Sequence, residues 1–376
     1  MKKDLFRKEL SRCATLVVKV GSKIVAMPDS AEGRQRMQRL VADLCDIAKE
    51  GLRVVLVSSG AIAHGMAALR LQKRPATMPL KQACASIGQH RLMLAYASEF
   101  DTHDVPIGQV LLTWDDLRDK KRYLNLRNTL FQLLECGAIP IINENDSVGI
   151  EEIRFGDNDT LGAQIAMLIN ADLYVMITDV NGLYDKNPLT HKDARHIPLV
   201  TRITGLLHDA AAGNSSEISV GGMRTKIKAA EIVTRAGIPA LIGNGCHGRL
   251  SEILRDPDAA TLFTHSDKRM NARDRWIAFA GKPKGILIID KGAVSALLEK
   301  GKSLLPAGVK RVSGTFSAGD TVEIQTEEYR AIARGMANYS CEEIDKLRGC
   351  KTSEIELRLG QKTFDEVVHR DNMALL

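Results

Sequence analysis

The sequence has no apolar run that approaches the roughly 18–20 residues needed to span a membrane. Near the N-terminus, the apolar run 16–18 is too short for the core of a signal peptide. The seven cysteines are scattered without a Cys-x-x-Cys pair, and histidine and cysteine do not gather at the spacing of zinc ligands. We therefore expect a cytoplasmic protein with reduced, mostly buried thiols and no zinc site.

The common nucleotide-binding motifs are also missing. The GKS at 301–303 lacks a glycine five residues before Gly301, where Ala296 stands, so it is not a Walker A loop. GNGCHG at 243–248 fits G-x-G-x-x-G, but the helical segment after it is too brief for a dinucleotide fold. We interpret this segment as a turn near a ligand-binding edge.

The composition is that of an ordinary globular protein. The chain has 376 residues, 44% of them hydrophobic and 26% charged, which suits two or three domains. Its net charge of +6 favours an anionic ligand but is too small to indicate nucleic-acid binding by itself.

Apolar, β-rich segments alternate with helical patterns through the first two thirds of the chain. This alternation predicts an α/β fold, with a mostly parallel sheet sandwiched between helices. Ligands of such sheets bind at the carboxyl ends of the strands. We predict strands at 15–20, 53–59, 107–112, 139–144, 173–178 and 239–243, and helices at 33–50, 81–100, 120–136, 158–169 and 223–236.

The pattern changes after about residue 262. A charged stretch gives way to short alternating segments that predict a small β-rich barrel domain, with helices at 293–300 and near 341–348. Earlier, 185–222 has weak periodicity and is expected to be a long excursion. We predict a main domain at 1–264, a linker at 265–275, the small domain at 276–365 and a tail at 366–376.

Two predicted strands end in groups suited to anions. Lys19 precedes Gly21 in VVKVGSK, where a fixed positive charge and turn amides suit phosphate. Ser59 and Gly60 join the next strand to a helical segment and offer hydroxyl and amide donors. The alternatives are a lysine exposed at a strand edge and an ordinary N-cap serine.

Two further segments suit a nucleotide. Gly221 and Gly222 precede an amphipathic helix that carries Lys226 in its first turn, which makes an anion cradle or, alternatively, a flexible hinge. Thr178 and Asp179 end a strand and could contact a nucleotide, or simply form a turn.

Two Asn-Asp pairs lie close together in INENDSVGIEEIRFGDNDT, at 145–146 and 158–159. Solvated loops have such pairs, and so do sites for a polar substrate and a metal-bound phosphate. Taken with the lysines and glycine turns, the pairs indicate phosphoryl transfer without a Walker loop, because this chemistry depends mostly on positioning and charge neutralisation.

These motifs resemble those of the glutamate 5-kinases, within the amino-acid-kinase family. VVKVGS, VSSGAIA, INENDSV, FGDNDTLGA, ITDVNGLY and GGMRTKIKAA occur in this order, and the C-terminal part resembles a PUA domain. The resemblance covers nearly the whole chain. Other amino-acid kinases, which act on another carboxylate, a carbamate or a nucleotide, share the lysine and glycine motifs but not the pair INEND and GDND.

The resemblance implies ATP-dependent phosphorylation of the γ-carboxylate of L-glutamate, the first step of proline biosynthesis, with Mg²⁺. It also implies feedback inhibition by proline and a homo-oligomer, either a dimer or a tetramer. PUA domains commonly bind RNA, but 276–376 has 15 Lys and Arg against 14 Asp and Glu, a net charge of +1. RNA is therefore the less favoured partner.

The resemblance also implies roles for single residues. Ser59, Asp146 and Asn158 would bind glutamate, and Asp159 would orient the lysines or help to place magnesium, for which no ligands are predicted. A glutamate side chain with a pKa of about 4.3 is already ionised, so neither aspartate is needed as a base. Two departures from the family pattern are Ser22–Lys23 for Thr-Ser and Ser219–Val220 for Gly-Thr. Contacts with ATP are expected from Lys19, Gly21, Thr178, Asp179, Gly221, Gly222, Met223, Arg224, Thr225 and Lys226.

Overall fold

A computed structural model describes residues 13–25, 30–149, 158–186, 188, 191–203, 222–246, 248–264, 276–278 and 283–376. The chain divides into two compact units, Met1–Arg269 and Met270–Leu376, which are considered separately. In the described part of the chain, no helix is both long enough and apolar enough to cross a membrane.

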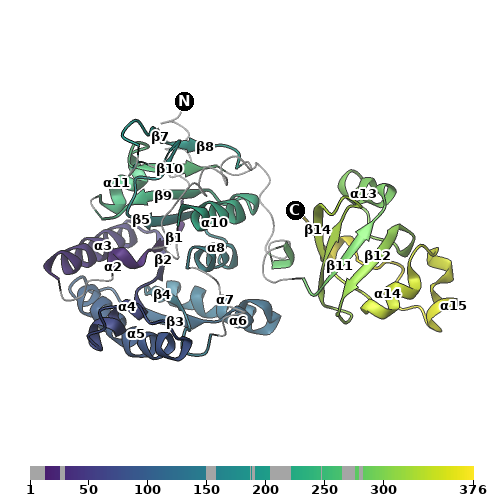
Figure 1. Ribbon diagram of the computed structural model, residues 1–376, viewed down its shortest axis with the longest axis horizontal. Coiled ribbons are helices and arrows are strands. Elements are labelled where there is room, and N and C mark those ends of the chain that lie inside the picture. The colour runs from purple at the N-terminus through teal and green to yellow at the C-terminus, as the bar shows by residue number, and fades with distance from the viewer. Residues whose placement is uncertain are drawn as a thin grey trace. The chain divides into compact units, whose positions relative to one another are not determined.

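The larger unit is built on an eight-stranded sheet with the order β3-β4-β2-β1-β5-β9-β10-β8 (Figure 1). All neighbouring strands are parallel except β9 and β10, so the predicted mostly parallel sheet is confirmed. Its strands are β1 (Thr15–Val20), β2 (Arg53–Ser58), β3 (Ile107–Leu112), β4 (Ile139–Glu144), β5 (Leu173–Thr178), β8 (Leu199–Val200), β9 (Ala240–Asn244) and β10 (Ala260–Phe263).

Helices cover both faces of this sheet, as the alternating pattern predicted. Figure 1 shows α3 (Ala31–Lys49), α5 (Met78–Asp101) and α11 (Leu250–Arg255) on one face, and α7 (Lys120–Glu135), α8 (Asn158–Leu168) and α10 (Met223–Arg235) on the other. Two helices, α2 (Ser22–Val25) and α6 (Trp114–Arg118), were not predicted, because they are too short to show a helical period. β6 (Leu183–Tyr184), which directly precedes the predicted excursion, pairs with β7 (His196–Ile197) inside it.

The central strands are buried on both faces, which explains their continuous apolar runs. In β1, Leu16, Val18 and Val20 belong to the hydrophobic core that includes Tyr96 of α5. Because successive side chains of a strand point to opposite faces, Lys19 faces the other side of the sheet, which α8 covers.

Two glycines allow α4 (Ala61–Ala68) and α5 to touch through their backbones. A Cβ atom at Gly88 would lie 1.8 Å from the carbonyl oxygen of Ala61, and one at Gly65 would lie 1.8 Å from that of Cys84. Because no larger residue fits at either position, this contact fixes α5 against the segment that follows β2.

The smaller unit has a five-stranded sheet and several short helices among its described residues. The sheet has the order β12-β11-β13-β14-β15, which agrees with the predicted β-rich domain. Residues 366–376 were expected to form a tail, but Val367 and Val368 are buried and β15 pairs with β14. A strand of three residues is too short to show an alternating pattern. The elements are β11 (Gly285–Ile289), β12 (Val309–Gly314), β13 (Thr321–Gln325), β14 (Ala331–Met336), β15 (Met373–Leu375), α13 (Lys291–Leu298), α14 (Cys341–Leu347) and α15 (Ile355–Leu359).

All seven cysteines are free thiols. Cys45, Cys84 and Cys350 are buried, three others are partly buried and Cys136 is exposed, so burial is less general than expected. Burial raises the pKa of the Cys45 thiol to about 11, which keeps it in the neutral form at physiological pH.

Candidate active site

The predicted polar residues lie at the carboxyl ends of neighbouring strands. β1 is in the middle, with β2 and β4 on one side and β5 and β9 on the other. From β1 the chain continues to β2 and the other strands on that side of the sheet, and it returns to the opposite side of β1 with β5. Such a point of reversal is where open parallel sheets bind their ligands.

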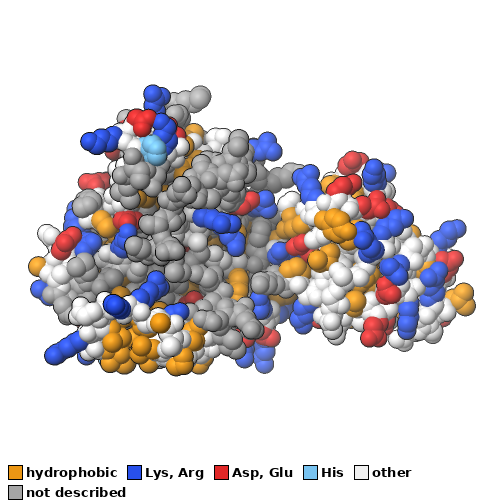
Figure 2. All heavy atoms as spheres, in the orientation of Figure 1, with side chains coloured by type: hydrophobic (Ala, Val, Ile, Leu, Met, Phe, Trp, Pro, Cys, Tyr) orange, Lys and Arg blue, Asp and Glu red, His pale blue; other side chains and the backbone are white. Residues whose placement is uncertain are grey.

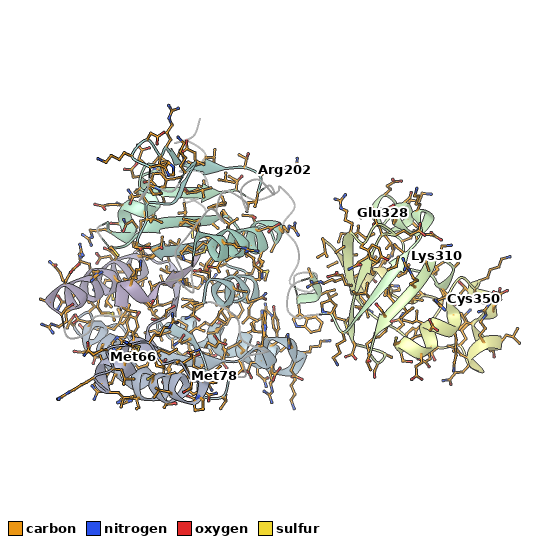
Figure 3. The ribbon with its side chains drawn as sticks, viewed as in Figure 1. Met66, Met78, Arg202, Lys310, Glu328 and Cys350 are labelled. Carbon is orange, nitrogen blue, oxygen red and sulfur yellow. The ribbon has the colours of Figure 1, made fainter. Side chains whose placement is uncertain are left out.

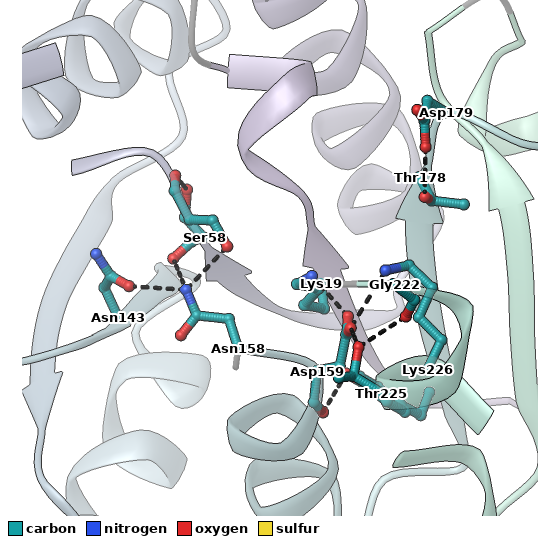
Figure 4. A network of polar contacts seen from close by, with 12 residues as sticks. Lys19, Ser58, Asn143, Asn158, Asp159, Thr178, Asp179, Gly222, Thr225 and Lys226 are labelled. Carbon is teal, nitrogen blue, oxygen red and sulfur yellow. Dashed lines mark hydrogen bonds and ion pairs between the residues drawn. The ribbon is translucent and has the colours of Figure 1, made fainter. Parts of the chain in front are cut away.

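The centre of the site is a buried carboxylate between two lysines (Figure 4). Asp159, the second residue of α8, places Oδ1 2.6 Å from Nζ of Lys19 and Oδ2 3.2 Å from Nζ of Lys226. The Asp159 side chain is 0% exposed and each lysine side chain is 5% exposed. The hydroxyl of Thr225 donates to Oδ2 of Asp159 at 2.8 Å. The structure thus brings together three residues that are far apart in the sequence.

The charges of this centre favour an anion. Burial alone would raise the pKa of Asp159, but the positive charges of Lys19 and Lys226 hold it below its ordinary value. The carboxylate is therefore ionised at neutral pH, and with two ammonium groups the set of three has a net charge of +1. A cationic, water-excluded site of this kind suits a transferring phosphoryl group.

The backbone at the start of α8 is held by a tyrosine that the sequence analysis did not single out. The hydroxyl of Tyr174 on β5 donates to the carbonyl oxygen of Asp159 at 2.8 Å. A Cβ atom at Gly162 would lie 2.4 Å from this hydroxyl, so the glycine makes room for the contact. The position of the carboxylate is therefore determined by β5 as well as by α8.

A cluster of amides lies next to this centre. Asn158, the residue before Asp159, places Nδ2 3.1 Å from Ser58 O, 2.9 Å from Ser59 Oγ and 3.1 Å from Asn143 Oδ1. Ser59 is not the N-cap of α4, because that position is Gly60, with φ of 110°. The Oδ1 atom of Asn158 is buried and has no hydrogen-bond partner in the described part of the chain.

A polar row on α5 holds the loop that follows β4. Gln82, Ser86 and Gln89 are spaced by four and three residues, which places them on one face of the helix. Gln82 donates to Gly149 O at 3.2 Å, and the hydroxyls of Ser86 and Ser147 are 2.8 Å apart. This loop contains Asp146, which is partly buried.

Gln89, the third member of the row, accepts from Nδ2 of Asn143 at 2.9 Å. The sequence analysis singled out neither Gln89 nor Asn143. The sequence signal that could have identified Gln89 was the polar row Gln82, Ser86 and Gln89. These residues have helical spacing within a helix that was predicted from its apolar residues.

On the other side of β1, Thr178 ends β5 and Asp179 follows it. The hydroxyl of Thr178 donates to Asp179 Oδ1 at 3.0 Å, and Lys23 Nζ lies 2.6 Å from Asp179 Oδ2. Burial alone would raise the pKa of Asp179, but the hydrogen bond and charge of Lys23 hold it below its ordinary value. Lys23, which departs from the family pattern, therefore adds a cation at this edge.

The glycines that were expected to bind phosphate differ in their surroundings. The N–H of Gly21 donates to Ile177 O at 3.2 Å, so this amide is engaged within the sheet. Gly222 is the N-cap of α10, Met223 is partly buried and Arg224 is exposed. Gly221, like 219–220, lies outside the described residues.

Gly245 and Cys246 form a turn directly after β9, which agrees with the turn expected in this segment. Asn244 ends β9 and donates to Asn181 Oδ1 at 3.0 Å, and the N–H of Gly245 donates to Thr178 O at 2.9 Å. The helix that follows, α11, has only six residues.

Comparisons with known proteins agree with this architecture. The model of the "Amino acid kinase family" matches residues 14–244, and the model of the "PUA domain" matches residues 285–359. The chain belongs to the amino acid kinase family.

Its curated relatives have a more specific name. A glutamate 5-kinase of Syntrophotalea carbinolica is 45% identical over 376 residues and covers 100% of both chains. A glutamate 5-kinase of Moorella thermoacetica is 45% identical over 371 residues, which is 98% of each chain. Among solved structures, UMP kinase from Ureaplasma parvum aligns with 67% of this chain and 99% of its own, at 15% identity and a TM-score of 0.47.

Proposed function

We propose that the chain transfers the γ-phosphoryl group of ATP to the γ-carboxylate of L-glutamate, which gives L-glutamyl 5-phosphate for proline biosynthesis. The observation that carries this proposal is the buried Lys19–Asp159–Lys226 centre directly beside the amide of Asn158. The 45% identity to glutamate 5-kinases over full length supports the choice of substrate. We assign the activity to a domain at 1–264, joined through 265–275 to a small domain that begins at 276.

The proposed reaction needs charge neutralisation and no general base. The substrate carboxylate, with a pKa of about 4.3 in a free side chain, is an ionised nucleophile at neutral pH. It has to approach a phosphate that is also negative, and Lys19 and Lys226 offset this repulsion. Asp159 engages one lysine with each carboxylate oxygen, so its role is to orient them.

The strand order supports this arrangement of the two substrates. Ser59 and Asp146 follow β2 and β4, where glutamate would bind with Asn158, and the α-ammonium of glutamate would pair with Asp146. Thr178 ends β5 and Asp179 follows it, where the nucleotide would bind with the first turn of α10. β1, which carries Lys19, lies between the two groups, so the γ-phosphate and the γ-carboxylate would meet above it.

We propose that Mg²⁺ enters as a complex with ATP. Within the described ranges, no group of three or more His, Cys, Asp or Glu side chains is arranged to hold a metal ion. Magnesium is commonly held by phosphate oxygens and water with only one or two carboxylates, so this chain suits the ion as part of a co-substrate.

The deciding experiment is a hydroxamate assay. The protein is incubated with ATP, Mg²⁺ and hydroxylamine, with L-glutamate, L-aspartate, N-acetyl-L-glutamate or UMP as the acceptor. We expect γ-glutamyl hydroxamate and ADP with L-glutamate only. ADP release with another acceptor and none with glutamate would reject the proposal in favour of another amino-acid-kinase activity.

Asp146→Asn tests the binding of the substrate ammonium. We expect KM for glutamate to rise about 10- to 100-fold, because a hydrogen bond between charged groups contributes roughly 1.5–3 kcal/mol. The kcat and the KM for ATP should stay within about twofold of wild type, since the lysine centre is intact. Steady-state kinetics with each substrate varied in turn checks this, and a loss confined to kcat would contradict the assignment.

We propose that the protein is a homo-oligomer in which α5 takes part in the contact. Figure 2 shows hydrophobic side chains gathered over α4 and α5, near Met66 and Met78 in Figure 3. Leu80 and Leu94 on α5 are 39% and 69% exposed and lie about four turns apart on one face. Leu94→Glu is expected to yield a monomer of 41.2 kDa in sedimentation at a concentration where wild type is a dimer or tetramer. An unchanged mass would exclude this face.

Two further proposals concern regulation and compartment. Proline would compete with glutamate, so that added proline raises KM for glutamate without changing kcat at saturation. The free state of all seven cysteines supports a cytoplasmic setting.

RNA binding by the smaller unit has narrower support. Arg311 stacks over Tyr329 at 5.4 Å, and this tyrosine is 63% exposed, but Lys310 lies 3.9 Å from Asp290. A mobility shift with structured RNA at physiological salt tests this function, and the absence of a shift would remove it.

A further inference from the structure

Two side-chain amides of the site are oriented by backbone groups whose hydrogen-bonding role cannot change. The N–H of Glu144 can only donate, and it lies 2.9 Å from Asn143 Oδ1. The carbonyl of Ser58 can only accept, and it lies 3.1 Å from Asn158 Nδ2. Flipping either amide would place donor against donor or acceptor against acceptor, so both orientations are determined.

The two amides are coupled to each other and to α5. Asn158 donates to Asn143 Oδ1 at 3.1 Å, and Asn143 donates through its own Nδ2 to Gln89 Oε1 at 2.9 Å. Asn143 is only 3% exposed, so water has little access to replace Gln89 as the acceptor. A relay of hydrogen bonds therefore runs from Asn158 through Asn143 to Gln89, whose Oε1 is the final acceptor.

This relay leaves one group without a partner. With Nδ2 of Asn158 directed at three acceptors, its Oδ1 points elsewhere, buried and without a hydrogen bond within the described segments. A buried acceptor without a donor is unfavourable, and a ligand that brings a donor removes that penalty. The next residue, Asp159, belongs to the lysine centre, so the donor would come from a substrate placed for transfer.

We propose that Gln89 is a positioning residue that sets substrate specificity. Acting through Asn143, Gln89 works together with the backbone groups of Ser58 and Glu144 to hold Asn158 Oδ1 as a second acceptor for the ammonium group that pairs with Asp146. The site thereby selects an acid with a free ammonium group over the same acid without one. This inference rests on the proposed function, because it concerns the acceptor substrate of that reaction. A site built to pair with a substrate N–H discriminates strongly against an analogue that lacks it.

The test uses two variants of Gln89 and two ligands. Gln89→Met removes the acceptor at similar size, whereas Gln89→Glu keeps an acceptor oxygen. Glutarate is glutamate without its ammonium group, and its inhibition constant against glutamate reports binding without that group.

For Gln89→Met we expect KM for glutamate to rise about tenfold while the inhibition constant of glutarate and the KM for ATP change less than about twofold. For Gln89→Glu we expect all three values close to wild type. Equal shifts for glutamate and glutarate, an unchanged glutamate KM in Gln89→Met, or a Gln89→Glu variant as impaired as Gln89→Met would each overturn the proposal. The proposed function fails separately, if wild type yields no hydroxamate from glutamate.

Discussion

Asp159→Asn is expected to lower kcat by about 10³-fold while KM for glutamate changes little. In Asp159 each carboxylate oxygen faces one lysine, whereas the neutral amide has only one acceptor oxygen, so its N–H₂ would face Lys19 or Lys226. Losing aligned charge at a transferring group has effects of about 10²–10³ in kcat for a single donor, and here both lysines are disturbed. Steady-state kinetics measures the split between kcat and KM.

The same substitution is expected to destabilise the fold in a pH-dependent way. The pKa of Asp159 is lowered in the folded state, so its contribution to stability is present above the unfolded pKa of about 3.9 and is lost as pH falls through the folded value. We expect the variant to have a free energy of unfolding about 3 kcal/mol lower at pH 7, and the difference to shrink below about pH 4. Urea unfolding at both pH values measures it.

A matched control for Asp159 is Asp116→Asn. Burial alone would raise the pKa of Asp116, but hydrogen bonds from Thr113 and Arg122 and the charge of Arg122 hold it below its ordinary value. Asp116 caps α6 and does not engage the lysines. This control should keep its kcat. Turnover near wild type in Asp159→Asn, or a stability difference that does not depend on pH, would contradict the role assigned to Asp159.

Lys226→Met is expected to lower kcat by about 10³-fold, because the net charge of the centre falls from +1 to zero. Asp159 keeps Lys19 at 2.6 Å, so no buried carboxylate is left unpaired and the melting temperature should fall by only a few degrees. Single-turnover measurements of ADP formation separate the chemical step from ATP binding.

Lys228→Met is the matched control for Lys226, since it removes an exposed lysine from the same helix. We expect it to turn over at the wild-type rate. A Lys226→Met variant with the turnover of this control would show that Lys226 has no part in the transfer.

The strands could be predicted where burial on both faces gives them a continuous run of apolar residues. β1 and β5 are buried along their whole length, and their continuous apolar runs gave the observed bounds. The order of the strands was not predictable, because each parallel crossover can place the next strand on either side. Only the structure puts β1 between β2, which Ser59 follows, and β5, which carries Thr178.

The candidate site was predicted in part for a related reason. Lys19, Asp159 and Lys226 lie near strand or helix ends, close to glycines in the sequence. A charged residue close to such glycines is a local pattern that can be recognised without the structure. Gln89 and Asn143 have no such pattern, because their contact joins residues 54 positions apart and exists only once α5 lies against β4. The acceptor of the Gly21 N–H could not be read from the sequence either, because it is the carbonyl of Ile177 on a neighbouring strand.

Asn158 and Asp159 are adjacent at the start of α8, so the chain itself limits the distance between the two parts of the site. One residue belongs to the amide cluster and the next to the lysine centre, and the peptide bond between them has a fixed length. Movements of the sheet or its loops cannot change the distance between the two Cα atoms, so the two side chains move together. In the proposed reaction, an acid one methylene shorter than glutamate, held by its ammonium group at Asn158, therefore stops short of the phosphoryl group.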